Sequence, residues 1–267
     1  MENKKYELLK DDTIVVDGFK LFRIRALKDF FVVKAGELGG YIEHEGCLDH
    51  NGYAWVYNDA KVYDASKVTE CGRVAGNAII TRGSKVTGFG LVKDNAVVKH
   101  YSTVEDESVV SGDAVVDSSD VKDNAIVTDS AYVHRHSIIK GFSTVGGNAR
   151  IHNAVIGGTS AIDGKSYVGA NCILVSVTLV NDAHVVGENF LRDVRIGFNV
   201  KTNGDTVVYT DPNHHIRMVA VSKSSNQATS WNANGTIEDV IAAQHDEAGK
   251  AKMRSLLQAH KDIYNIQ

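Results

Sequence analysis

A β-branched aliphatic residue stands at every sixth position through the middle of the chain. The first unbroken run consists of Val62, Val68, Val74, Ile80, Val86, Val92, Val98, Val104, Val110 and Val116. Two residues before each of them stands Gly, Ala or Ser, from Ala60 to Ala114. After a deletion of one residue the pattern resumes at Val121 and continues to Ile151. Successive members of this series would lie about 240° apart around an α-helix, so the period excludes a helix.

A second period of 18 residues is superimposed on the first. It is marked by the triplets Asn58-Asp59-Ala60, Gly76-Asn77-Ala78, Asp94-Asn95-Ala96 and Gly112-Asp113-Ala114. Because 18 is three sixes, one structural unit is a coil with three sides, and Gly and Asn tolerate the left-handed backbone angles of its corners. We therefore predict an all-β solenoid over residues 36–203. Its class is a left-handed parallel β-helix of hexapeptide repeats, with coils that become irregular after Ile156.

The N-terminal segment, residues 1–35, has a different pattern. Residues 13–24 alternate around an Asp17-Gly18 turn, which predicts a β-hairpin that caps the first coil. A cap is needed because the end of a solenoid exposes unpaired strand edges. We expect three aromatic residues near the first full coil to pack against this cap: Trp55, Tyr57 and Tyr63.

Residues 204–267 are predicted to form a small C-terminal α/β module. Segments 207–209 and 216–221 are typical of strands, and the capping-box-like Thr236-Ile-Glu-Asp239 predicts a helix start. Trp231 is expected to anchor the module. A second helix is predicted over residues 247–264, with one face formed by Met253, Leu256, Leu257, His260 and Tyr264.

Composition narrows the classes of partner. The formal net charge is -4, and no run of Lys and Arg exceeds two residues, which argues against nucleic acid. No apolar stretch approaches the roughly 20 residues that cross a bilayer, and the N-terminus lacks the apolar core of a signal peptide. Three widely spaced cysteines without a CxxC motif are typical of reduced thiols, so we expect a cytoplasmic protein.

Residues 21–43, LFRIRALKDFFVVKAGELGGYIE, and residues 54–63, AWVYNDAKVY, resemble the YdcK-like hexapeptide-repeat proteins. The segment NGTIEDVI at 234–241 resembles the C-terminal module of the phage members. The resemblance covers the chain in outline. It implies a left-handed β-helix, a homotrimer, and a phage or prophage origin with a bacterial host's cytoplasm as location. Proteins of this type are often labelled transferases, but that label derives from the repeat alone, and fold does not fix function.

An acyltransferase of the hexapeptide class is one enzymatic alternative. Resemblance to that class implies a histidine general base, with acetyl-CoA in a groove between trimer subunits. Such enzymes hold the base near a long loop, whereas residues 60–151 carry no insertion beyond one residue. A base must also lie within hydrogen-bond reach of the nucleophile. The histidines available are coil residues, for which exposure without chemistry is the ordinary role: His100, His134, His136, His152 and His184.

A metal site is a second alternative. His134 and His152 are 18 residues apart and should stack on one outer face, with His136 on the same coil as His134. Three imidazoles would suit zinc, which γ-class carbonic anhydrases hold through histidines on a left-handed β-helix. However, the His-x4-His spacing of those enzymes is absent, and Arg135 between two of the histidines disfavours a cation. We therefore favour ordinary polar stacking.

The third alternative is a scaffold without catalysis. Phe89, Tyr101 and Phe142 each precede a small corner residue, which directs their side chains outward. They could form a subunit or partner interface or pack over their own coil corner, and the sequence leaves both open. We predict a non-enzymatic homotrimer without a cofactor. It would bind a host protein or a small-molecule partner, in host takeover, defence inhibition or assembly.

Overall fold

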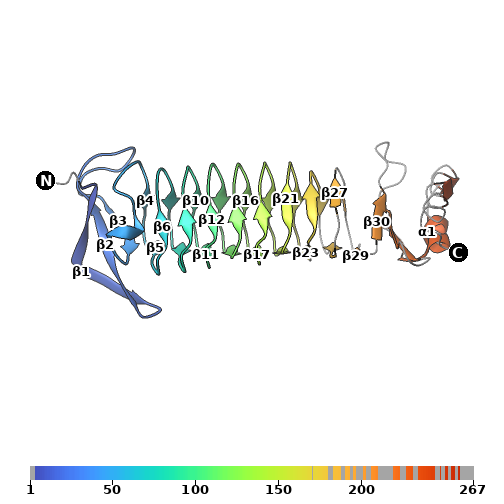
Figure 1. Ribbon diagram of the computed structural model, residues 1–267, viewed down its shortest axis with the longest axis horizontal. Coiled ribbons are helices and arrows are strands. Elements are labelled where there is room, and N and C mark those ends of the chain that lie inside the picture. The colour runs from blue at the N-terminus through green and yellow to red at the C-terminus, as the bar shows by residue number, and fades with distance from the viewer. Residues whose placement is uncertain are drawn as a thin grey trace.

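The computed structural model describes residues 4–169, 171–179 and 183–187, with separate strands and helical residues between 190 and 258. Its main body is a parallel β-solenoid, in which short strands stack into three sheets, one for each side of the coil (Figure 1). The smallest of these sheets has 8 strands, which corresponds to about eight coils. The predicted three-sided solenoid is confirmed, and its left-handed winding stays a prediction.

The largest sheet runs from the N-terminal cap to the last coil. Its 12 strands are β1 (Tyr6–Val16), β2 (Phe19–Ala26), β3 (Leu38–Ile42), β5 (Lys61–Val62), β8 (Ile79–Ile80), β11 (Val97–Lys99), β14 (Val115–Asp117), β17 (Tyr132–His134), β20 (Arg150–His152), β23 (Tyr167–Gly169), β26 (His184–Val185) and β29 (Lys201–Thr202). The pairs β1–β2 and β2–β3 are antiparallel, whereas β3 pairs with β5 in parallel. Strand β3 thus joins the cap to the coils.

The other two sheets contain only coil strands. The 9-stranded sheet consists of β4 (Trp55–Val56), β7 (Arg73–Val74), β10 (Leu91–Val92), β13 (Val109–Val110), β16 (Ile126–Val127), β19 (Thr144–Val145), β22 (Ala161–Ile162), β25 (Thr178–Leu179) and β28 (Arg195–Ile196). The 8-stranded sheet consists of β6 (Lys67–Val68), β9 (Lys85–Val86), β12 (Thr103–Val104), β15 (Asp120–Val121), β18 (Ile138–Ile139), β21 (Val155–Gly157), β24 (Ile173–Val175) and β27 (Phe190–Arg192).

The predicted aliphatic series lines the inside of the coils. Each of its members, from Val62 to Val116 and from Val121 to Ile151, is completely buried. The small residues two positions earlier are buried as well, because a larger side chain has no room where the chain turns. The buried Ser102 shows how a hydroxyl is accommodated there. Its Oγ donates to the Lys99 carbonyl at 2.6 Å and accepts from the Ser119 N–H at 3.0 Å.

The polar triplets form one corner of the coil, as predicted. The first residues of four triplets have positive φ angles: Asn58 (54°), Gly76 (68°), Asp94 (62°) and Gly112 (68°). The predicted deletion is confirmed as well. Val98 pairs with Val116, but Val104 pairs with Val121, so one residue is lost between them. The loss occurs at a different corner, the one that carries Tyr101.

The N-terminal cap is a hairpin packed on the first coils through aromatic side chains. It is longer than predicted, because β1 already begins at Tyr6, and it turns at Asp17 (φ 50°) and Gly18 (φ 85°). The Trp55 ring meets Tyr6 edge-on with centroids 6.1 Å apart, and the Tyr63 hydroxyl donates to Asp17 Oδ2 at 2.8 Å. The expected role of these two aromatic residues in the cap is therefore confirmed.

The chain continues beyond β29 into a 4-stranded antiparallel sheet and a helix. These elements are β30 (Thr206–Tyr209), β31 (Val219–Ser222), β32 (Gln227–Ser230), β33 (Asn234–Thr236) and α1 (Ile237–Ala242). Strands β30 and β31 overlap the two predicted segments, and α1 begins directly after Thr236, as predicted. Trp231 and the apolar face of the second predicted helix lie outside the described residues. Within the described part of the chain, no helix is long and apolar enough to span a bilayer.

Candidate functional site

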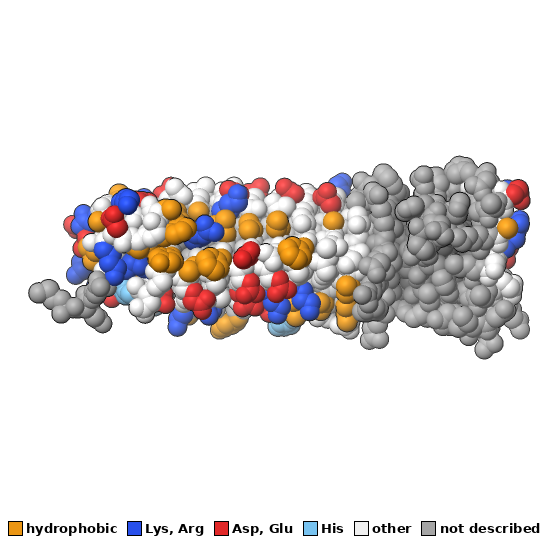
Figure 2. All heavy atoms as spheres, turned by 90° about the horizontal axis from the view of Figure 1, so that it is seen from above, with side chains coloured by type: hydrophobic (Ala, Val, Ile, Leu, Met, Phe, Trp, Pro, Cys, Tyr) orange, Lys and Arg blue, Asp and Glu red, His pale blue; other side chains and the backbone are white. Residues whose placement is uncertain are grey.

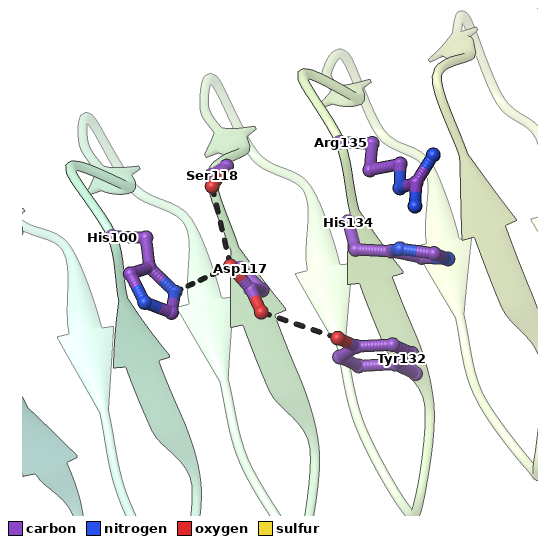
Figure 3. A pocket seen from close by; sticks show the side chains of 6 residues that line it. All are labelled: His100, Asp117, Ser118, Tyr132, His134 and Arg135. Carbon is purple, nitrogen blue, oxygen red and sulfur yellow. Dashed lines mark hydrogen bonds and ion pairs between the residues drawn. The ribbon is translucent and has the colours of Figure 1, made fainter.

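A hollow of about 480 Å³ lies on the outer face of the 12-stranded sheet, over β14 and β17. Its lining consists of His100, Asp117, Ser118, Tyr132, His134 and Arg135 (Figure 3). Two of the histidines predicted as candidates, His100 and His134, are thus brought into one site. Asp117, Ser118, Tyr132 and Arg135 join them. The sequence did not point to any of these four as a functional residue, since Arg135 was considered only as a charge that disfavours a cation.

Strand geometry explains how these side chains come together. Residues on either side of an inward-facing position point outward, so Asp117 flanks the buried Val116, and Tyr132 and His134 flank the buried Val133. Asp117 pairs with His134 across neighbouring coils. The remaining side chains come from the adjoining corner, where His100, Ser118 and Arg135 have φ angles of 57°, 50° and 56°.

Asp117 is the centre of a hydrogen-bond network. Its Oδ1 lies 2.7 Å from His100 Nδ1 and accepts from the Ser118 hydroxyl at 3.2 Å. Its Oδ2 accepts from the Tyr132 hydroxyl at 3.2 Å and lies 3.5 Å from Lys99 Nζ. One carboxylate therefore ties together groups from three successive coils (Figure 3).

These contacts fix the charge on Asp117. Its burial would raise the pKa of the carboxyl, but the hydrogen bond from His100 and the charge of Lys99 outweigh burial and hold that pKa below its usual range. Burial, followed by the charge of Asp117, raises the pKa of the Tyr132 phenol. At neutral pH Asp117 is therefore an anion, and Tyr132 remains protonated and donates to it.

The second ring nitrogen of His100 is also engaged. Arg82 Nη1 lies 2.5 Å from His100 Nε2. A guanidinium can only donate, so Nε2 accepts, and we assign the ring hydrogen to Nδ1, which donates to Asp117. A general base needs a lone pair directed at the proton that it removes. Because Arg82 occupies that lone pair, His100 could act as a base only after the arginine moved away.

His134 and His152 stack on the same face, as predicted from their spacing. They are paired residues of β17 and β20, and their rings meet edge-on with centroids 4.8 Å apart. Tyr132 stacks on His134 with centroids 4.5 Å apart. Burial is the main cause that lowers the pKa of His134, and the charges of His152 and Arg135 lower it further. The environment thus favours the neutral imidazole.

The other two candidate histidines lie elsewhere. His136 lies at the corner with a φ of 60°, not on the flat face beside His134 and His152. His184 lies on β26, with its ring centroid 5.9 Å from that of Tyr167. Among the described residues, the trio His134, His136 and His152 is not a group whose ligand atoms lie within 4.8 Å of one another.

The chain matches no protein-family model and no curated protein sequence. The resemblance of residues 21–43 to YdcK-like proteins therefore stays an expectation from the sequence. Function has to be argued from the coil geometry and from the side chains that the coils expose.

The three predicted interface residues are exposed but do not lie together. Phe89, Tyr101 and Phe142 have 59%, 82% and 69% of their surface exposed. Phe89 lies between β9 and β10, and Phe142 lies between β18 and β19. Both are therefore at the corner where the 8-stranded sheet meets the 9-stranded sheet. Tyr101 follows β11 and lies at the corner beside the hollow. Figure 2 shows hydrophobic side chains gathered in rows along the coils on one face of the molecule.

One cluster of chemically active residues was missed by the sequence reasoning. The ligand atoms of Glu43, His44 and Cys47 lie within 4.8 Å of one another at the first coil. The sequence carries a Glu-His-x-x-Cys motif at 43–47, but it contains no CxxC pair, which is the stronger sign of a metal site. The short turn that brings these residues together could have been inferred only from where the first coil begins.

Proposed function

We propose that this chain is a non-enzymatic β-solenoid that assembles as a homotrimer and binds a partner through the faces of its coils. The observation that carries the proposal is the presence of large, exposed aromatic side chains at two different corners of the prism. Exposed aromatic residues of this size are typical of interfaces. The resemblance to YdcK-like proteins of phages suggests where the protein acts. The location would be a bacterial cytoplasm, and the role would be host takeover, defence inhibition or assembly.

The distribution of these residues favours a ring of three chains over a two-fold dimer. A two-fold interface uses one patch against itself, whereas a closed three-fold ring joins two different patches on each chain. Phe89 and Phe142 supply one patch, to which Tyr53 adds a further exposed ring on the same corner (51% exposed). Tyr101 supplies the other: its ring packs against Gly83, where an added Cβ would be only 2.5 Å from Tyr101 Cε1. It is packed against the preceding coil and yet remains 82% exposed.

Light scattering on two variants tests the assembly. Phe89→Glu with Phe142→Glu removes the first patch, and Tyr101→Glu removes the second. At micromolar concentration we expect the mass of a trimer for the unchanged chain and a monomer for either variant. An equimolar mixture of the two variants retains one intact interface between unlike chains, so it should give heterodimers. Val15→Glu is the matched control, because Val15 is 72% exposed on the cap hairpin.

A monomeric mass for the unchanged chain would contradict the trimer. So would a trimer that survives both sets of substitutions, or one that Val15→Glu disrupts as much as they do. If the unchanged chain is trimeric but the mixture stays monomeric, the two aromatic patches do not contact each other in the trimer, and this outcome contradicts the proposed interface.

An acyltransferase remains the second candidate because of one feature. The hydrogen bond from His100 Nδ1 to Asp117 is the arrangement that orients a catalytic imidazole. Calorimetric titration with acetyl-CoA separates the two candidates, and we expect no saturable binding. Tight binding that His100→Ala abolishes would replace the scaffold by the enzyme. A γ-carbonic-anhydrase-like zinc site has less support, because its three histidines do not converge.

A further inference from the structure

The first coil holds three different metal-ligating side chains in one place. Glu43 directly follows the last residue of β3. His44 is the N-cap of the short 3-10 helix η1 (Glu45–Cys47), and Cys47 is the last residue of that helix. The carboxylate, imidazole and thiol ligand atoms all lie within 4.8 Å of one another. Carboxylate, imidazole and thiolate are the three side-chain ligands of zinc in proteins.

The separation of the atoms is close to that of a zinc site. His44 Nδ1 lies 3.9 Å from Cys47 Sγ. Tetrahedral coordination, with Zn–S about 2.3 Å and Zn–N about 2.1 Å, places sulfur and nitrogen about 3.6 Å apart. The side chains would therefore have to approach by only about 0.3 Å, which is within the freedom of an exposed imidazole.

Neighbouring groups hold the ligands in position. Glu43 Oε2 accepts from the Asp64 N–H at 2.7 Å, which links the carboxylate to the next coil. Cys47 is completely buried, whereas His44 is exposed and leaves a route from solvent. The competing interaction is the hydrogen bond that His44 Nδ1 accepts from the Gly46 N–H at 3.1 Å, which metal binding would replace. Gly46 is exposed, so water can take over as the partner of its N–H group.

We propose that Glu43, His44 and Cys47 form a zinc site, with water as a fourth ligand. On binding, the Cys47 S–H bond is replaced by an S–Zn bond, and the proton is released to solvent without a change of redox state. The site ties the end of β3 to the corner of the following coil through Glu43 and Asp64. Its role is to staple the first coil beneath the cap. It does not depend on self-association, because all its ligands come from one chain.

Cobalt substitution and competition with a chromophoric zinc chelator test the site on the full-length protein. Cobalt bound by a thiolate gives a sulfur-to-metal charge-transfer absorption, which reports Cys47 directly. We expect this band in the unchanged protein, one zinc per chain, and a higher melting temperature with zinc. Loss of an outer-shell partner commonly weakens metal affinity about 10–100-fold, so His44→Gln, which removes a direct ligand, should cost roughly a hundredfold or more.

Cys47→Ser should abolish the charge-transfer band, and Cys71→Ser is the matched control that should keep it, since Cys71 is half-buried on a later coil. His44→Gln covers the case in which Cys47→Ser fails to fold, because His44 is exposed and can be changed without opening the core. The proposal is overturned if the unchanged protein gives no charge-transfer band. It is equally overturned if His44→Gln or a folded Cys47→Ser binds zinc as tightly as the unchanged chain.

Discussion

The N-terminal cap and the repeated coils bury different kinds of side chain. The cap and the coil beneath it hold the largest fully buried residues, with Trp55, Tyr6, Tyr63 and Lys5 at the top of the range. The coils from β8 onward bury mainly Val, Ile, Ala and Ser, each repeated at the same place in the next coil. Apolar burial is thus concentrated in a few residues at one end and divided evenly along the rest.

This difference follows from what each region has to do. A coil is covered by its neighbours on both sides, so identical small side chains fill its interior and nearest-neighbour contacts provide its stability. The cap has a neighbour on one side only and must close the end of the core with bulk. Substitutions should therefore have unequal effects in the two regions, and the predictions that follow are ordered by the size of that effect.

The largest effect is expected for Trp55→Ala on β4, in the coil directly beneath the cap. The indole is completely buried and meets the Phe30 ring edge-on with centroids 5.3 Å apart. Truncating a buried Trp to Ala costs about 3–5 kcal/mol. Val98→Ala, at an equally buried coil position, removes two carbon atoms and should cost about 1.6 kcal/mol at roughly 0.8 kcal/mol per carbon. Urea denaturation of both variants measures the difference in the free energy of unfolding.

Trp55→Phe is the control for this comparison. The Trp55 Nε1 is buried without a hydrogen-bond partner, so a phenyl ring keeps most of the packing and removes that donor. We expect Trp55→Phe to retain most of the stability. Equal losses for Trp55→Ala and Val98→Ala would show that stabilisation is not concentrated at the capped end of the solenoid.

The same difference decides what could be predicted from the sequence. The coil interior could be predicted because the same buried Val or Ile position recurs every six residues. Every member of this series is indeed buried. The start of the cap hairpin could not be predicted. Strand β1 extends back to Tyr6, and its pairing with β2 is irregular between Leu9 and Thr13. Nothing in the polar segment around Lys5 indicates that its ammonium group would be buried against Ala54, because that contact joins residues 49 positions apart.

The candidate site was predictable only in part, for a related reason. The spacing of His134 and His152 places them on one face, and the structure confirms this. The partner of His100 was hidden, because Asp117 pairs with Lys99 in the strand ladder and reaches His100 only by a diagonal contact at the corner. Phe89 and Phe142 lie at a different corner from Tyr101. The corner that each residue occupies is known only once the flanking strands are assigned to sheets.

Lys5→Met is expected to have the second-largest effect, visible as a change in pH dependence. Lys5 is 1% exposed, its Nζ donates to the Ala54 carbonyl at 2.8 Å, and burial lowers its pKa from 10.5 to about 8. Between these values the unfolded chain binds a proton that the folded chain does not. The free energy of unfolding should therefore rise with pH above about 8, by at most about 1.4 kcal/mol per pH unit.

Lys5→Met removes the contribution of the Lys5 ammonium group to the pH dependence of stability. The test is therefore the difference in the free energy of unfolding between the two proteins at each pH. Other groups titrate in both of them, including Tyr63, whose pKa is raised to about 12 mainly by burial. Urea denaturation from pH 7 to pH 10 should show that the free energy of unfolding of the unchanged chain rises relative to that of Lys5→Met as the pH rises. A difference that is constant with pH would mean that Lys5 keeps its ordinary pKa in the folded protein.

The smallest effect is expected on the coils, from Arg135→Gln beside the stacked histidines. Burial first, and then His152 and Arg135, lower the pKa of His134, so the folded protein binds fewer protons than the unfolded chain just below pH 6.5. Stability is therefore lost as the pH falls through that window. Removing the Arg135 charge should raise the His134 pKa, which is measured from the imidazole resonance by NMR. Arg73→Gln, on the 9-stranded sheet, should leave it unchanged. An unaltered His134 pKa in Arg135→Gln would mean that solvent screens this charge completely, and that only burial sets the histidine's behaviour.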